Sequence, residues 1–182
     1  MVEPVSAEQV VRFWREAGPS MWFQKDDAFD AAIRARFEDA HHAAARNEYS
    51  GWEQTPEGAL ALVILLDQFP RNLYRGSGHA FATDGLALAI AKGAVSNGFD
   101  RQTDGVLRIF YYMPFEHSES LDDQRAAVRL FEAYGDEEYL RYARLHADII
   151  ERFGRFPHRN IMLGRQSHTE EIAFLADGGF AG

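Results

Sequence analysis

The sequence contains no cysteine, which excludes a disulfide framework, a thiolate metal site and a cysteine nucleophile. It has no long apolar run either, since the longest strictly apolar stretch, Ala59–Leu66, is far shorter than the roughly 20 residues of a membrane-spanning helix. Met1–Ser6 lack the basic region and the apolar run of a signal peptide. We therefore expect a cytoplasmic protein with no membrane partner, which suits a chain without disulfides.

Positive charge is also scarce, because the formal net charge is −9 at pH 7. A chain of this charge lacks the strongly basic face that nucleic-acid binding requires, although a local basic pocket stays open. The glycine-rich dinucleotide fingerprint, the Walker loop and the esterase elbow are absent from the sequence as well. The sequence therefore predicts neither a nucleic-acid partner nor a cofactor.

Alternating strand patterns are nearly absent, and apolar residues recur instead with the 3.6-residue period of helices. The chain has 182 residues, of which 46% are hydrophobic, enough for one substantial core. No linker or change in composition marks a boundary. We expect a single all-α domain over residues 1–182, with flexibility confined to the first five residues and to those after Ala176.

Capping signals predict about eight helices joined by short loops, which implies stacked antiparallel helix pairs. Ser6 and Gln9 form a capping box for the first helix, and Asp26 or Asp27 opens a second that ends near Arg46. Thr55 and Pro56 open a third, which is apolar all round and should lie in the middle of the fold. The other expected helices are His79–Asn97, Thr103–Tyr112, Leu121–Tyr134, Glu137–Phe153 and Glu170–Ala176, the last capped by Thr169.

Three polar segments, expected to be non-helical, each follow an amphipathic helix and place proline among aromatic and hydrogen-bonding side chains. They are Asp67–Asn72, Met113–Glu119 and Arg152–Asn160, the last continuing to Arg165. From Arg152 to Arg165 the chain carries four arginines, one histidine and no acid. Because guanidinium forks match carboxylates and anionic ligands alike, this segment predicts either internal arginine–glutamate networks or an anion-binding pocket.

The histidines near these segments have different expected roles. His117 lies between Glu116 and Glu119, which suits either acid–base chemistry or an ordinary hydrogen-bonded loop. The arginines around His158 disfavour its charged form, and His146 falls on an apolar helical stripe, as a core residue would. A metal site built from Glu116, His117, Glu119 and His158 lacks any recognised ligand spacing, so we expect no metal.

The three segments resemble the hallmarks of one bacterial family, the domain of unknown function numbered nine hundred and twenty-four. The resemblance rests on the runs Leu65–Asn72, Pro114–Glu119 and Arg152–Asn160, and extends from Phe13-Trp14 to Phe174-Leu175. It implies a compact all-helical fold of tetratricopeptide-like kind. It implies no reaction, substrate or cofactor.

Two functional hypotheses follow from the sequence, which assigns neither an oligomeric state nor an enzymatic reaction. In the first, His117 and Glu116 transfer a proton at a pocket for a small carboxylate or phosphate. In the second, the helix pairs present a concave surface to a protein or peptide partner, and the loop arginines are structural. The ligand-binding residues expected under the first hypothesis are Arg71, Asn72, Arg155, His158, Arg159 and Asn160.

Overall fold

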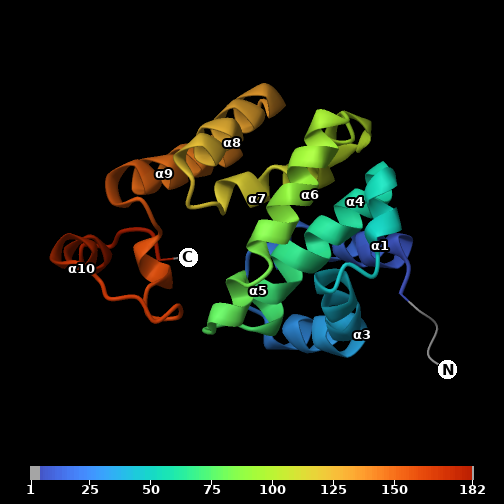
Figure 1. Ribbon diagram of the computed structural model, residues 1–182, viewed down its shortest axis with the longest axis horizontal. Helices are drawn as coiled ribbons and strands as arrows, with labels where there is room; N and C mark the ends of the chain where they lie inside the picture. The colour runs from blue at the N-terminus through green and yellow to red at the C-terminus, as the bar shows by residue number, and fades with distance from the viewer. Residues whose placement is uncertain (1–4, 182) are drawn as a thin grey trace. The chain divides into compact units, whose positions relative to one another are not determined.

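The computed structural model describes residues 5–181, which are helical throughout and contain no strand (Figure 1). The predicted all-α class is confirmed. The described chain forms two compact units, one of residues 5–75 and 79–114, the other of residues 76–78 and 115–181. Each unit is described by itself, and the single-domain organisation stays a prediction.

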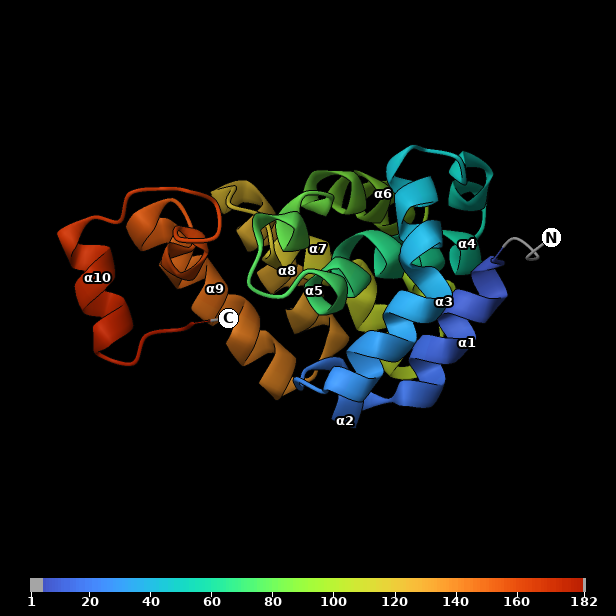
Figure 2. The same cartoon turned by 90° about the horizontal axis from the view of Figure 1, so that it is seen from below.

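The first unit begins with α1 (Ala7–Ala17) and α3 (Asp27–Ala45), joined through the short α2 (Pro19–Trp22). The capping box of Ser6 and the cap by Asp26 are both present as predicted. Figure 2 shows α1 and α3 side by side, and the Phe13 ring of α1 contacts Phe29 and Phe37 of α3. Aromatic packing thus holds the first two long helices together.

Helix α4 (Pro56–Val63) follows a 3-10 turn at Ser50–Gln54 and lies at the centre of the first unit. Thr55 caps it by accepting a hydrogen bond from the Gly58 amide, and every residue from Gly58 to Val63 is buried. It packs against α1 and against α6 (Asp84–Ser96), as Figure 1 shows. An all-round apolar helix does occupy the middle, as expected.

The prediction of a non-helical Asp67–Asn72 is wrong, because the chain continues as a π-helix (Ile64–Gln68) and then as α5 (Phe69–Leu73). In the π turn the Phe69 amide donates to the Ile64 carbonyl, five residues back. Pro70 has no amide hydrogen for the carbonyls of Leu65 and Leu66. His41 Nδ1 lies 2.8 Å from the first, and Thr83 Oγ1 lies 2.5 Å from the second. Side-chain donors therefore let a helix pass through a proline.

Other boundaries also differ from the predicted ones. The expected helix His79–Asn97 is a 3-10 turn at Gly78–Phe81 followed by α6, and the expected helix Thr103–Tyr112 is a 3-10 helix at Gly105–Tyr111. A further 3-10 turn covers Asp100–Gln102. In the tighter 3-10 winding, residues three apart share a face, which puts the buried Leu107 and Phe110 on one side. Apolar spacing in a short segment does not distinguish this winding from an α-helix.

Helices α8 (Leu121–Tyr134) and α9 (Glu137–Phe153) form an antiparallel pair in the second unit, at the predicted positions (Figure 1). Gly135 turns the chain with φ +87°, and Asp136 caps α9. The unit also contains a 3-10 turn at Pro157–Arg159 and α10 (Thr169–Ala176), which His168 rather than Thr169 precedes as the cap residue. The short α7 (Met113–Glu116), within a segment expected to be non-helical, spans the boundary between the units. Among the described helices, none has the length and apolar character needed to cross a membrane.

Replacing Thr83 with valine should destabilise the first unit. Valine keeps the shape of threonine but leaves the buried Leu66 carbonyl without its donor, which costs about 1–3 kcal/mol of unfolding free energy. Urea unfolding of Thr83→Val measures the loss. Thr169→Val, at an exposed position, is the control and should change stability by less than about 0.5 kcal/mol. Equal stability of Thr83→Val and the wild-type protein would contradict the role given to this hydroxyl.

Candidate functional site

Arg71 and Asn72, two of the predicted ligand-binding residues, lie on α5 in the first unit and bond to carboxylates. The Arg71 guanidinium donates to both Asp84 carboxylate oxygens, at 3.0 and 3.1 Å, and to the Asp67 carbonyl. Asn72 Nδ2 donates to Asp30 Oδ1 at 2.7 Å. Burial opposes the charge of Arg71, but Asp67 and Asp84 outweigh it and raise the pKa of the guanidinium. Arg71 is therefore a permanently charged residue held by acids of its own unit.

In the second unit, Glu171 of α10 collects bonds from two other predicted ligand-binding residues. Arg155 donates to its two oxygens at 2.6 and 2.8 Å, and Asn160 Nδ2 donates to one of them at 3.2 Å. The His168 amide completes the set at 2.7 Å. The hydrogen bond from Arg155 is the main cause that lowers the pKa of Glu171 to about 2. This buried carboxylate fixes the segment after α9 to the start of α10.

Glu119 connects the second and third polar segments. Arg165 donates to both of its carboxylate oxygens at 2.8 Å, and the Phe156 amide donates to Oε1 at 2.9 Å. Burial would raise the pKa of Glu119, but these donors together lower it. The bonds of Glu119 and Glu171 form the internal arginine–glutamate network anticipated from the sequence. They leave the prediction of anion binding untested, and show which bonds a ligand at Arg155 or Asn160 would have to replace.

The partner of Glu116 is His146 of α9. Glu116 Oε1 lies 2.8 Å from His146 Nδ1, and each of the two side chains is only 9% exposed. The same Nδ1 lies 2.8 Å from the Tyr142 carbonyl oxygen. Because a carbonyl only accepts hydrogen bonds, we assign the proton to Nδ1, which leaves the lone pair of the neutral ring on Nε2. A carboxylate that orients an imidazole in this way is the usual support of a general base.

Two further cationic or titratable side chains share one aromatic ring with His146. The fully buried Phe156 ring lies 5.4 Å from the His146 ring, 5.6 Å from the His158 ring and 4.5 Å from the Arg159 guanidinium carbon. Arg159 Nη1 also donates to the His117 carbonyl at 3.1 Å. We call Glu116, His146, Phe156, His158 and Arg159 the Glu116–His146 cluster. It unites Glu116, His158 and Arg159, three of the predicted site residues, while His117 contributes its backbone carbonyl.

His146 was predicted to be a core residue, and its burial is confirmed, but its pairing with Glu116 was not foreseen. The signal available in the sequence is weak. A histidine on a buried stripe requires a hydrogen-bond partner, and the adjacent acids of the second segment were candidates. Choosing among Glu116, Glu119 and a backbone carbonyl needs the position of α9 relative to α7.

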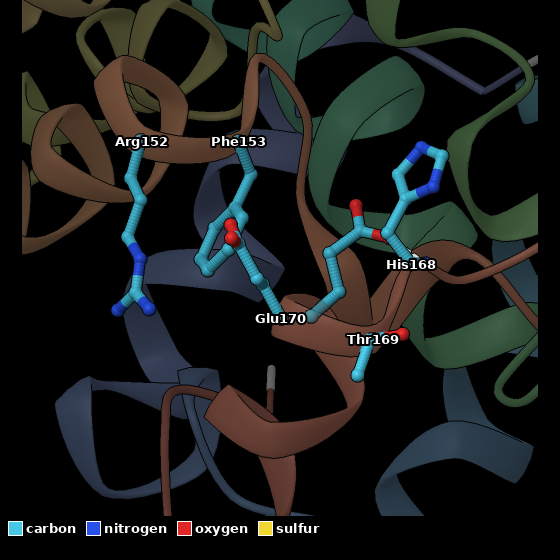
Figure 3. A pocket seen from close by; sticks show the side chains of 6 residues that line it. Arg152, Phe153, His168, Thr169 and Glu170 are labelled. Carbon is cyan, nitrogen blue, oxygen red and sulfur yellow. Dashed lines mark hydrogen bonds between the residues drawn. The ribbon is translucent and has the colours of Figure 1, made fainter.

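A surface depression of about 470 Å³ lies on another part of the second unit (Figure 3). Arg152 and Phe153 at the end of α9 line it together with His168–Glu171 at the start of α10. Two of these lining residues are the carboxylates Glu170 and Glu171, which disfavour an anion there. Within residues 5–181, no group of three or more metal-ligating side chains is arranged to hold a metal ion, so the metal alternative gains no geometric support.

Comparisons with known proteins agree with the resemblance noted in the sequence. The family model described as bacterial protein of unknown function (DUF924) matches residues 10–179, and the chain belongs to this family. A solved structure of a protein of unknown function, ATU0120 from Agrobacterium tumefaciens, is similar with a TM-score of 0.92 and 49% identity. The alignment covers 94% of this chain and 97% of that one. No curated protein matches the chain.

The stability contributed by the Arg155–Glu171 pair should be lost in acid. Because the pKa of Glu171 in the folded protein, about 2, is below its ordinary 4.5, the contribution is complete above pH 4.5 and disappears as the pH falls towards 2. Urea unfolding of wild-type protein and Glu171→Gln across this range should give a stability difference that shrinks on acidification. The exposed neighbour, in Glu170→Gln, is the matched control. A difference that is constant with pH would argue against the ion pair.

Proposed function

We propose that this member of the DUF924 family binds a small anionic ligand, a carboxylate or a phosphate, at the Glu116–His146 cluster and exchanges a proton with it. The observation that carries this proposal is the 2.8 Å contact between Glu116 Oε1 and His146 Nδ1 in a buried setting. A buried ionisable pair is a costly arrangement, since both groups have lost water. Such pairs concentrate at sites where proton transfer is needed.

His146 is the proton-exchanging residue in this proposal, and Glu116 is its positioning residue. With Nδ1–H directed at Glu116 and the Tyr142 carbonyl, the Nε2 lone pair can accept a proton from a ligand. The imidazolium that forms is stabilised by the Glu116 carboxylate. His117 was the sequence-based choice for this role, and the structure supports its neighbour's partner instead, because it is His146 that Glu116 orients.

Arg159 and His158 supply the anion-binding side of the cluster. The guanidinium of Arg159 is buried against the Phe156 ring, and low dielectric strengthens its attraction for a ligand's negative charge. His158 contacts the same ring and offers a hydrogen-bonding nitrogen. The other predicted ligand-binding residues have a supporting role in this proposal, because their polar groups already hold Asp84, Asp30 and Glu171; they are Arg71, Asn72, Arg155 and Asn160.

The second candidate function is a protein-interaction module, and one observation favours it. Arg71, Arg155 and Arg165 all bond to carboxylates of their own unit, as expected if the loop arginines are structural. Large apolar side chains are also exposed, among them Ile161 at 88% and Ile172 at 58%. A tetratricopeptide-like stack of helix pairs would offer such residues to a partner's helix or extended peptide. The buried proton-exchanging pair has no purpose in this alternative, so we rank it second.

A panel of small carboxylates and phosphates should raise the melting temperature of the protein. A ligand at 100 times its dissociation constant adds about 2.7 kcal/mol, equivalent to a shift of about 5 °C or more for a chain of this size. His146→Gln and Arg159→Lys should abolish or reduce the shift. Calorimetry of the same ligand in two buffers with different ionisation enthalpies should report proton uptake in the wild-type protein and none in His146→Gln.

Arg152→Gln is the matched control, because Arg152 lines the surface depression and is not part of the cluster. It should keep both the shift and the proton uptake. Loss of binding in Arg152→Gln with retention in His146→Gln would place the ligand in the depression and refute the proposal. If the panel gives no shift, a pull-down is the next experiment. Capture of a defined partner by wild-type protein and equally by Arg155→Ala would then establish the interaction module.

A further inference from the structure

The segment Gly178–Ala181, which follows α10, brings an aromatic ring onto the Glu116–His146 cluster. The Phe180 ring lies 4.6 Å from the His146 ring and 5.3 Å from the His158 ring, with an edge-to-face arrangement in both cases. It also packs against the buried group formed by Ile149, Ile150 and Phe156. One side chain from the end of the described chain therefore covers both histidines of the cluster.

We propose that Phe180 is a movable cover over His146, which closes the site against water and must swing aside before a ligand reaches Nε2. This inference rests on the proposed function for its purpose, although not for its geometry. His146 is only 7% exposed with the ring in place, so a ligand cannot approach it freely. Exclusion of water would strengthen the electrostatic interactions of the closed site.

Two consecutive glycines produce the turn that returns Phe180 to the cluster. Gly178 has φ +81°, in the left-handed region that favours glycine. A Cβ on Gly179 would lie 2.5 Å from the Phe174 carbonyl oxygen and 2.6 Å from its ring, so a larger residue there must displace the segment. Gly179 is therefore required by close approach, and the position of Phe180 depends on it.

The segment is held in a way that permits opening. Its backbone bonds are those of Gly178 to the Leu175 carbonyl and of Gly179 to the Phe174 carbonyl, at the end of α10. Beyond Gly179 it is held by the half-buried ring of Phe180. Segments with few buried contacts open locally at low free-energy cost while the rest of the protein stays folded. Opening here needs no change in α9, which carries His146.

Diethyl pyrocarbonate labelling of the full chain, read by mass spectrometry, tests the cover without a ligand. The reagent transfers its ethoxycarbonyl group to an unprotonated imidazole nitrogen, which in His146 is Nε2. Phe180→Ala should increase the labelling rate of His146 about tenfold, because burial of a phenylalanine ring favours the closed state by at least that factor. Gly179→Ala keeps the ring but displaces the segment, and should also increase the rate.

Two variants and one residue serve as controls. Phe153→Ala removes a ring from the same apolar group without uncovering His146, and Gly85→Ala adds a Cβ where nothing lies within 4 Å. Neither should change the rate at His146. The exposed His168 is the internal reference in every variant. Circular dichroism confirms that each variant is folded.

Three results would overturn the cover. They are labelling of wild-type His146 as fast as that of His168, no increase in folded Phe180→Ala and Gly179→Ala, and an equal increase in Phe153→Ala. Failure of the proposed function is distinguishable from these. If His146 labelling rises in both segment variants while no carboxylate or phosphate shifts the melting temperature of any of them, the cover is established and the anion-binding function is refuted.

Discussion

The need to give buried carboxylates hydrogen-bond donors is the constraint on which the second unit depends. Glu119 and Glu171 each lie in or beside a loop and each take several donors, from arginine side chains and from backbone amides. Neither could stay ionised in the interior without them. The donors come from residues 155–168, so the two acids determine the path of this irregular stretch. The cluster residues Phe156, His158 and Arg159 lie on that path, and the two acids therefore also determine the geometry of the candidate site.

Local sequence signals predicted the elements whose ends they define. Ser6, Asp26 and Thr55 opened helices where expected, because a cap acts through its own backbone within a few residues. The helix through Pro70 was not predictable in this way. Its carbonyls are satisfied by His41 and Thr83, which are distant in sequence, so the rule that proline ends a helix was overridden by tertiary contacts.

The candidate site was predictable to a similar degree. Unusual chemistry in the segments around Glu116 and Arg155–Asn160 identified the region, and three of the residues chosen there lie in the cluster. His146 was missed as a site residue because its helical stripe indicates only that it is buried. The arginines illustrate the reverse error of emphasis: a run of cations without local acids predicts a distant anion, and for Arg155 and Arg165 that anion is a glutamate of the same unit. Sequence spacing does not distinguish such a glutamate from a ligand.

The π turn at Ile64–Gln68 has a consequence for how the family's first polar segment tolerates change. A π turn accommodates one residue more than an α-helical turn over the same rise, so it sets the rotational phase of every residue that follows. Removing a single residue from it would rotate the following side chains by roughly 100° about the helix axis. Arg71 and Asn72 would then face away from Asp84 and Asp30. In this stretch the number of residues is constrained as strictly as their identity, and a one-residue deletion would do more harm than most substitutions.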